Sequence, residues 1–145
     1  MNFMEFDNVV EELRSRKPIL FGLKSDNIAS DEELIHVENY YQIQLPESYK
    51  QFLKKYGGGY FVYTVVYSCD TASKFYIIHN VLKEWVDKYN FLPVIDFQTG
   101  DMGGFKINNK KCDELFCIYN HDEKQVVESE ECDFFQALVM YGLKL

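Results

Sequence analysis

No segment of this sequence is apolar for long enough to cross a bilayer as a helix. The longest apolar run, from Tyr60 to Tyr67, has eight residues, whereas a membrane-spanning helix needs about 20. The first residues carry acidic side chains where a secretory signal has basic ones, so we expect no signal peptide. We therefore expect a soluble domain in the cytoplasm.

Basic side chains are also in short supply. The chain has 15 Lys and Arg against 23 Asp and Glu, which gives a formal net charge of −8. Because attraction between cations and phosphates supplies most non-specific affinity for nucleic acids, we expect no direct binding to DNA or RNA. The acidity is concentrated between Asp113 and Asp133, where eight acids stand against the single base Lys124. This segment either attracts a cationic partner or serves only as a solvated face.

Cysteine is scarce, and its spacing matches no common metal motif. In a reducing cytoplasm we expect the four cysteines to be free thiols rather than disulfides. Zinc is the chemical alternative, because Cys112, Cys117, His121 and Cys132 are residue types that zinc prefers. Structural zinc sites, however, usually place a close Cys pair about two to four residues apart, and Cys117 falls inside an apolar strand pattern. We expect no metal and no cofactor.

Catalytic motifs are missing as well. The sequence has no Gly-x-Ser-x-Gly nucleophile elbow. A thiolate of Cys69 or Cys117 would need His79 or His121 beside it as a base, and the spacing implies no such pair. The glycines at 57–59 follow a helix, whereas a phosphate-binding loop leads into one. The sequence therefore predicts a protein that is not an enzyme.

What the sequence does contain is a series of amphipathic helical segments. The first reads from about Phe6 to Leu13, and a second begins at the capping box formed by Ser30 and Glu33. The third is the strongest local signal: Pro46 suits its first position and Gly57 a left-handed cap after its end. Its apolar positions recur at helical spacing, and they are Tyr49, Phe52, Leu53 and Tyr56.

The second half of the chain alternates between strands and turns. Residues 60–67 read as one central strand, residues 75–78 as either a short strand or an extended lead-in, and residues 81–89 as a helical stripe. An antiparallel meander then follows, with strands predicted at residues 92–97, 104–108, 114–119 and 125–128. A closing helix is predicted for residues 133–143. Helices first and a meander after them indicate the α+β class.

The stretch from Ile28 to Gly59 resembles the signature of the SUKH superfamily, the Smi/Knr-type domains. It has a Ser30-capped helix, then Glu38, and then the run from Leu45 to Gly59, which reads LPESYKQFLKKYGGG. Many relatives have an aspartate where this chain has Asn108. The resemblance implies one SUKH-like α+β domain over residues 1–145, with helices packed against a twisted, antiparallel-rich sheet.

The resemblance also implies a binding role. Bacterial members similar to this chain are typically immunity proteins of polymorphic toxin systems, which neutralise a nuclease, a deaminase or a related toxin by direct binding. Fungal relatives act as regulatory scaffolds, so a regulatory scaffold or adaptor domain is the alternative.

A cationic toxin would be steered toward carboxylates, so we expect the acidic segment and the neighbouring turn to form the contact face. The expected partner-binding residues are Asp96, Asp101, Glu114, Asp122, Glu123, Glu128, Glu130 and Glu131. The tyrosines Tyr60, Tyr63 and Tyr67 offer a second possible contact surface, and lining the core is the equally open alternative.

Overall fold

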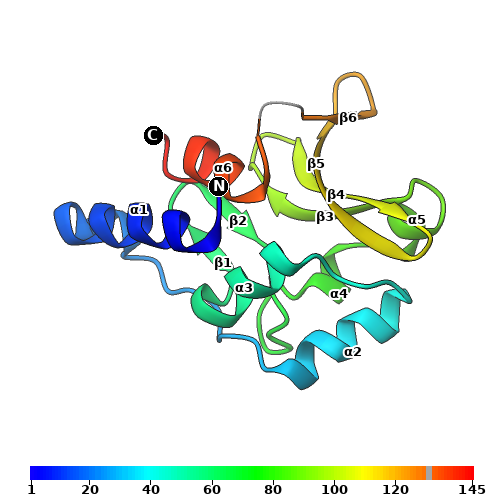
Figure 1. The fold of residues 1–145 in the computed structure, drawn as a ribbon, viewed down its shortest axis with the longest axis horizontal. Helices are drawn as coiled ribbons and strands as arrows, with labels where there is room; N and C mark the ends of the chain where they lie inside the picture. Colours follow the sequence, from blue (N-terminus) through cyan, green and yellow to red (C-terminus); the bar gives the residue numbers. More distant parts are fainter. Residues whose placement is uncertain (130–131) are drawn as a thin grey trace.

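The computed structural model describes residues 1–129 and 132–145. Within this part of the chain an antiparallel sheet contains six strands in the order β1-β2-β3-β4-β5-β6, so each strand pairs with its neighbour in sequence. Figure 1 shows helices gathered around this sheet, with the hairpin of β5 and β6 projecting at the upper right. The α+β fold predicted from the sequence is confirmed.

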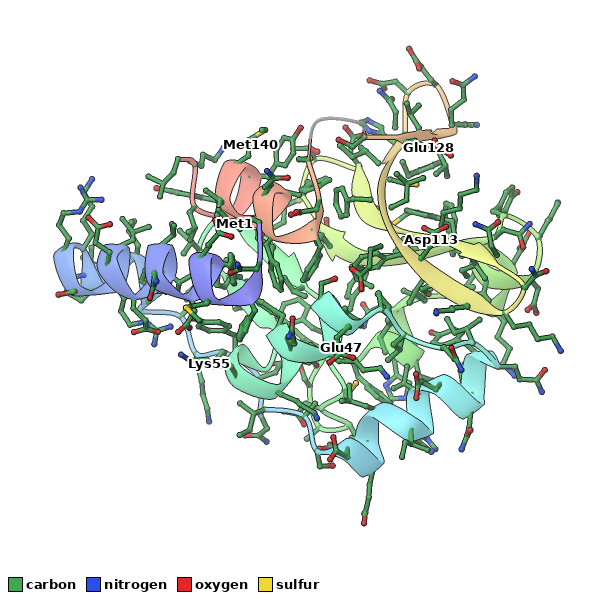
Figure 2. All side chains as sticks on the ribbon, in the orientation of Figure 1. Met1, Glu47, Lys55, Asp113, Glu128 and Met140 are labelled. Carbon is green, nitrogen blue, oxygen red and sulfur yellow. The ribbon has the colours of Figure 1, made fainter. Side chains whose placement is uncertain are left out.

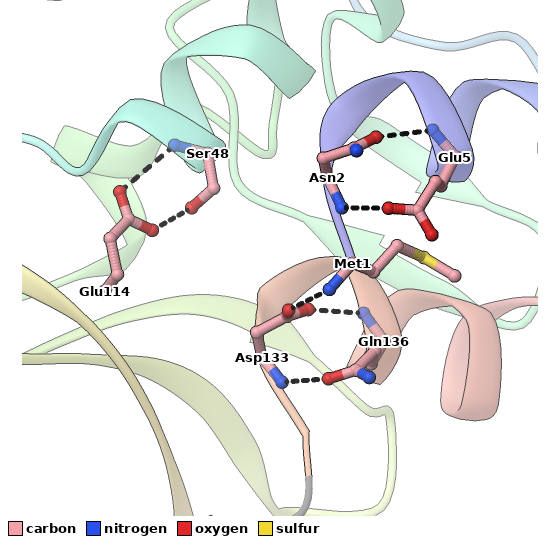
Figure 3. Close-up of polar contacts among 7 residues, drawn as sticks. All are labelled: Met1, Asn2, Glu5, Ser48, Glu114, Asp133 and Gln136. Atoms are coloured by element: carbon pink, nitrogen blue, oxygen red, sulfur yellow. Dashed lines mark hydrogen bonds and ion pairs between the residues drawn. The ribbon is translucent and has the colours of Figure 1, made fainter.

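The first helix, α1 (Phe3–Arg16), starts three residues before the predicted stripe because Asn2 caps it. The Asn2 side chain accepts a hydrogen bond from the Glu5 backbone, and the Glu5 side chain accepts one from the Asn2 backbone (Figure 3). The helix buries its apolar face and ends at Arg16. A short 3-10 turn, η1 (Pro18–Phe21), follows because Pro18 cannot continue the backbone hydrogen bonds of the helix.

Helix α2 (Asp31–Tyr41) begins at the predicted capping box, in which Ser30 and Glu33 satisfy each other's backbone N–H groups. Helix α3 (Glu47–Tyr56) buries all four residues of its predicted stripe. Pro46 is its N-cap with extended backbone angles, and so the prediction that Pro46 is the first helical residue is wrong by one position. Gly57 has φ +79°, the positive value expected for the residue that follows a helix.

The prediction of one central strand over residues 60–67 is wrong. The chain forms β1 (Gly59–Phe61) and β2 (Thr64–Val66), which pair with each other as a hairpin, and β1 lies at an edge of the sheet. The turn between them has no Gly, Asn or Pro to mark it, and Val62 adopts φ +55°. The Tyr63 backbone N–H donates to the Gly142 carbonyl at 3.0 Å, so a distant segment stabilises the turn.

Two short helices replace the next predicted elements. The strand expected at residues 75–78 is reduced to a single bridge between Ser68 and Tyr76, and helix α4 (Ile77–Asn80) follows at once. The helical stripe expected at residues 81–89 forms only α5 (Lys83–Asp87). Leu82 and Tyr89 therefore lie outside this helix, one on each side of it.

The meander was predicted well. Its strands are β3 (Phe91–Asp96), β4 (Met102–Asn108), β5 (Lys111–Asn120) and β6 (Gln125–Glu128). Pro93 is tolerated in the interior strand β3 because the register shifts between Pro93 and Ile95. The backbones approach so closely there that a Cβ on Gly104 would lie 2.0 Å from the Leu92 carbonyl oxygen.

The closing segment is helical, as predicted. Helix α6 (Phe134–Ala137) continues as a wider π-type turn, η2 (Leu138–Gly142). Asp133 and Gln136 form a third capping box, and the N-terminal ammonium of Met1 donates to Asp133 at 2.7 Å (Figure 3). The two ends of the chain are therefore joined.

An aromatic core fills the space between the sheet and helices α1, α3 and α6. Phe6 stacks on Phe135 with ring centroids 4.9 Å apart, and Phe134 contacts Phe52 and Phe105. These rings mark the inner face of the sheet. Along each strand side chains alternate, so the neighbours of the core residues point to the outer face. No helix in the described residues is both long and apolar enough to span a membrane.

Candidate partner-binding surface

Three of the predicted acidic residues gather at the turn between β5 and β6. Asp122 and Glu123 are exposed in this turn, which covers residues 121–124. Asp101, which comes just before β4, accepts hydrogen bonds from the His121 backbone N–H at 3.0 Å and from its Nδ1 at 2.5 Å. The structure thus fastens the acidic turn to the neighbouring β3–β4 loop.

The contact between His121 and Asp101 shifts both ionisation equilibria. The hydrogen bonds that His121 donates, first from its backbone and then from its ring, lower the pKa of Asp101. The hydrogen bond to Asp101, with the charge of Asp122 adding to it, raises the pKa of His121. His121 also lies 3.2 Å from Asp122 through Nε2, so its protonated ring would link both carboxylates.

Asp96 lies beside Asp101 in the sheet and Glu128 at the end of β6 away from the turn, and both are already engaged. Asp96, at the end of β3, pairs with Met102 beside Asp101, and its side chain accepts a hydrogen bond from the Gln98 backbone at 2.7 Å. Glu128, at the end of β6, accepts from the Lys106 ammonium at 3.0 Å. Its charge is therefore partly balanced on the outer face of the sheet.

Glu114 is the residue that the structure does not bring to this turn. Its carboxylate accepts hydrogen bonds from the Ser48 hydroxyl at 2.6 Å and from the Ser48 backbone at 3.3 Å, at the start of α3 (Figure 3). The acidic turn begins seven residues further along β5, which is roughly 20 Å at the usual rise of a strand. Glu114 joins β5 to α3, whereas Glu130 and Glu131 lie outside the described residues.

Beside the acidic turn lies a groove that the sequence did not indicate. Helix α5 packs on the outer face of the sheet, where Trp85 contacts Tyr119 at 5.0 Å and Phe91 at 6.1 Å between ring centroids. A cleft of about 480 Å³ separates this helix from the β5–β6 hairpin. We call it the outer-face groove, and its lining residues are Leu82, Glu84, Trp85, Tyr89, Tyr119, Lys124 and Val126. Of the helical stripe expected at residues 81–89, Val81 is buried, whereas Leu82 and Tyr89, which flank α5, are exposed.

The three tyrosines considered as a second surface do not form one. Tyr67 is buried, and its carbonyl accepts a hydrogen bond from the Tyr49 hydroxyl at 2.5 Å. Tyr63 is exposed in the β1–β2 turn, and Tyr60 packs against Phe75. Side chains alternate along a strand, so even a single strand would have placed Tyr60 and Tyr63 on opposite faces. The hairpin turn at residues 62–63 separates the three tyrosines further.

All four cysteines are free and buried, as expected. Burial raises the pKa of the Cys69 and Cys112 thiols to about 12 and that of Cys117 to about 11. These three thiols stay protonated at neutral pH and are poor nucleophiles. Within residues 1–129 and 132–145, no group of three or more His, Cys, Asp or Glu side chains is arranged to hold a metal ion.

The signature residues Glu38, in α2, and Gly57, after α3, have structural roles. The Glu38 side chain accepts a hydrogen bond from the Leu45 backbone at 2.8 Å and lies 3.4 Å from the Lys50 ammonium. It therefore fixes the connection between the two helices. Gly57, at the end of α3, approaches the chain at Asp26, where a Cβ would lie 2.1 Å from the Asp26 carbonyl oxygen.

Comparison with known families gives one match. The family model SUKH_6, described as SMI1-KNR4 cell-wall, matches residues 31–136. The matched region contains α2, α3, every strand of the described sheet and most of α6. No curated protein and no solved structure matches the chain.

Proposed function

The chain belongs to the SUKH_6 (SMI1-KNR4) family, and from this membership we propose that it is an immunity protein that binds and neutralises a cognate toxin in the cytoplasm. SUKH domains are known as immunity proteins of polymorphic toxin systems and are generally non-catalytic. The match over residues 31–136 is the observation that carries the proposal, because it spans the described sheet together with α2 and α3.

The charge of the chain supports a cationic partner. A toxin that acts on nucleic acid presents Lys and Arg to hold phosphates, and a surface of carboxylates competes for the same cations. Asp122 and Glu123 are exposed at the tip of the projecting hairpin, so they can meet such a surface first. We propose that this turn, with Asp101 and Asp96 beside it and Glu128 behind it, contacts the toxin.

The three remaining predicted acidic residues are Glu114, Glu130 and Glu131, and only the last two belong to the proposed surface. Glu130 and Glu131 follow β6 directly in the sequence, and we include them in the proposed surface on that ground alone. Glu114 is bound to Ser48, and we assign it a structural role. Charge near a binding surface acts mainly on the rate of association, so reversing it should slow complex formation more than it hastens dissociation.

The test is to co-express this chain with the toxin domain encoded beside it and to measure cell survival and complex formation by size exclusion. Survival together with a stable complex would establish the immunity role. The variant Asp122→Lys/Glu123→Lys should associate about tenfold more slowly. The matched control is Glu12→Lys/Glu32→Lys. It changes the net charge by the same amount as the test variant, at exposed helical positions distant in sequence from the acidic turn. No survival and no complex would reject the proposal in favour of a regulatory scaffold.

A further inference from the structure

The outer-face groove exposes apolar and aromatic side chains that the fold does not need to expose. Leu82 is 70% exposed and Tyr89 is 51% exposed, although both flank a helix that is packed on the sheet. Val126, across the groove on β6, is exposed too. Contiguous exposed apolar surface of this kind, rimmed by polar residues, marks interaction sites in soluble proteins.

The groove and the acidic turn form one continuous surface. Tyr119 pairs with Val126 in the β5–β6 ladder, and the next pair, Asn120 with Gln125, closes the turn that carries Asp122 and Glu123. An apolar centre beside a charged rim is the usual anatomy of a protein interface. Glu84, which also lines the groove, adds a carboxylate near α5.

The lining favours a planar cation over a purely apolar group. Trp85 lies 5.4 Å from Tyr89 and 5.0 Å from Tyr119 between ring centroids, so three rings surround the cleft. The Lys88 ammonium lies 5.4 Å from the Tyr89 ring centroid, so this ring already contacts a cation at the edge of the groove. A guanidinium stacks on aromatic faces and is less strongly hydrated than an ammonium, so it loses less on entering such a cleft.

A carboxylate is in place to receive the guanidinium. Glu84 has a weak intrahelical ion pair with Lys88 at 3.7 Å, and both side chains are more than half exposed. Such a pair contributes little and exchanges readily. Its carboxylate can therefore turn to a guanidinium and accept two parallel hydrogen bonds from it.

From this geometry we propose that the outer-face groove is the anchor site for the toxin, and that it takes an arginine side chain from the toxin's cationic face. The inference rests on the proposed function for the identity of the partner. Trp85, Tyr89 and Tyr119 enclose the guanidinium, Glu84 binds it, and the acidic turn steers it in. Lys124 lines the same groove, and its positive charge opposes the binding of the arginine there.

The first experiment does not need the toxin. Trp85 is the only tryptophan in the chain, so its fluorescence reports the groove directly. N-acetylarginine amide should change the emission with weak but saturable binding. N-acetylcitrulline amide, which has the same shape without the charge, should bind at least fivefold more weakly. A response that does not saturate, or equal binding of the two probes, would overturn the proposal.

Two variants sharpen this titration. Lys124→Met removes the opposing charge and keeps an unbranched side chain at a position where φ is +53°, so arginine amide should bind about threefold more tightly. Tyr89→Ser should weaken binding about tenfold. Tyr63→Ser is the control, since Tyr63 has a comparable exposure of 47% in the β1–β2 turn, and it should leave binding unchanged. Equal effects of Tyr89→Ser and Tyr63→Ser would contradict the assignment.

The second experiment uses the inactivated toxin domain encoded beside this chain. Tyr89→Ser and Leu82→Ser should each weaken the complex about tenfold through faster dissociation, and Tyr63→Ser should not. A full-strength complex with Tyr89→Ser would remove the groove from the interface while leaving the immunity role intact. If no complex forms at all, the proposed function and the toxin as occupant both fail, and the amide titration alone decides whether the groove binds arginine.

Discussion

Single residues hold this fold together where two segments of backbone meet without room for a side chain. At Gly57 the backbone has φ +79°, and a Cβ would overlap the Asp26 carbonyl. The conformation and the close approach both require glycine there. Gly57 of the family signature is therefore required for packing. For this reason it does not indicate where a partner binds.

Replacing Gly57 with alanine should lower the free energy of unfolding by about 2 kcal/mol or more, because the substitution is strained in φ and also displaces Asp26. Urea denaturation would measure the loss. Gly22→Ala is the control, since Gly22 has φ −72° and its nearest atom to a new Cβ is 3.2 Å away. Similar losses for the two variants would contradict this account.

The contact between His121 and Asp101 gives the hairpin a dependence on pH. The pKa of His121 is raised above its ordinary 6.5, so its stabilising effect is complete below that value and is lost as the pH rises through the raised pKa. The pKa of Asp101 is lowered from 3.8, so its effect is present above 3.8 and is lost as the pH falls through the lowered pKa. The pair therefore stabilises the fold most between these two limits.

Replacement of His121 with glutamine should remove this dependence. The stability difference between the wild type and His121→Gln should be largest near pH 5 to 6 and should shrink as the pH rises past the raised pKa of His121. Urea denaturation at a series of pH values would measure it. A difference that stays constant with pH would show that the ionised pair contributes nothing.

Whole elements depend on contacts that lie far away in sequence. The hairpin of β1 and β2 turns at Val62, a β-branched residue with φ +55°, and such residues rarely adopt positive φ. The Gly142 carbonyl, at the end of η2, accepts the Tyr63 N–H and stabilises this turn. The strain at Val62 is thus offset by the C-terminal segment.

Replacing Val62 with asparagine should therefore preserve or raise stability, by up to about 1 kcal/mol, because asparagine adopts left-handed backbone angles more easily. Thermal or urea unfolding would detect the change. A loss of more than about 1 kcal/mol would mean that the packing of the Val62 side chain outweighs the strain.

The whole molecule carries its charge unevenly. The segment from Asp113 to Asp133 has a formal charge of −7, whereas residues 14–24 contain four cations and no acid. In Figure 2, Asp113 and Glu128 lie at the right, on the side opposite α1, whose last turn carries Arg14 and Arg16. This arrangement would orient the protein relative to a cationic partner such as the proposed toxin.

The rate of association with the toxin should accordingly fall as salt is added, by about tenfold between low and physiological ionic strength, because exposed charges are screened over roughly 8 Å. Stopped-flow mixing, observed through Trp85, would measure it. The dissociation rate should change much less. A salt-independent association rate would contradict steering by the acidic turn.

The sequence alone determined the elements whose signals are local. These elements are the capping box of Ser30 and Glu33, the stripe of α3, Gly57 and the turn-bounded strands β3 to β6. They depend on residues only a few positions apart, and the family signature consists of such residues. The acids of the β5–β6 turn were also visible as a run of charge. The tertiary structure decided the rest. It split residues 60–67 at Val62 through a contact with Gly142, paired Glu114 with Ser48, and left Leu82 and Tyr89 exposed on either side of α5 at the outer-face groove. Each of these outcomes depends on groups brought together from distant parts of the chain. The spacing of residues within one segment therefore does not predict these contacts.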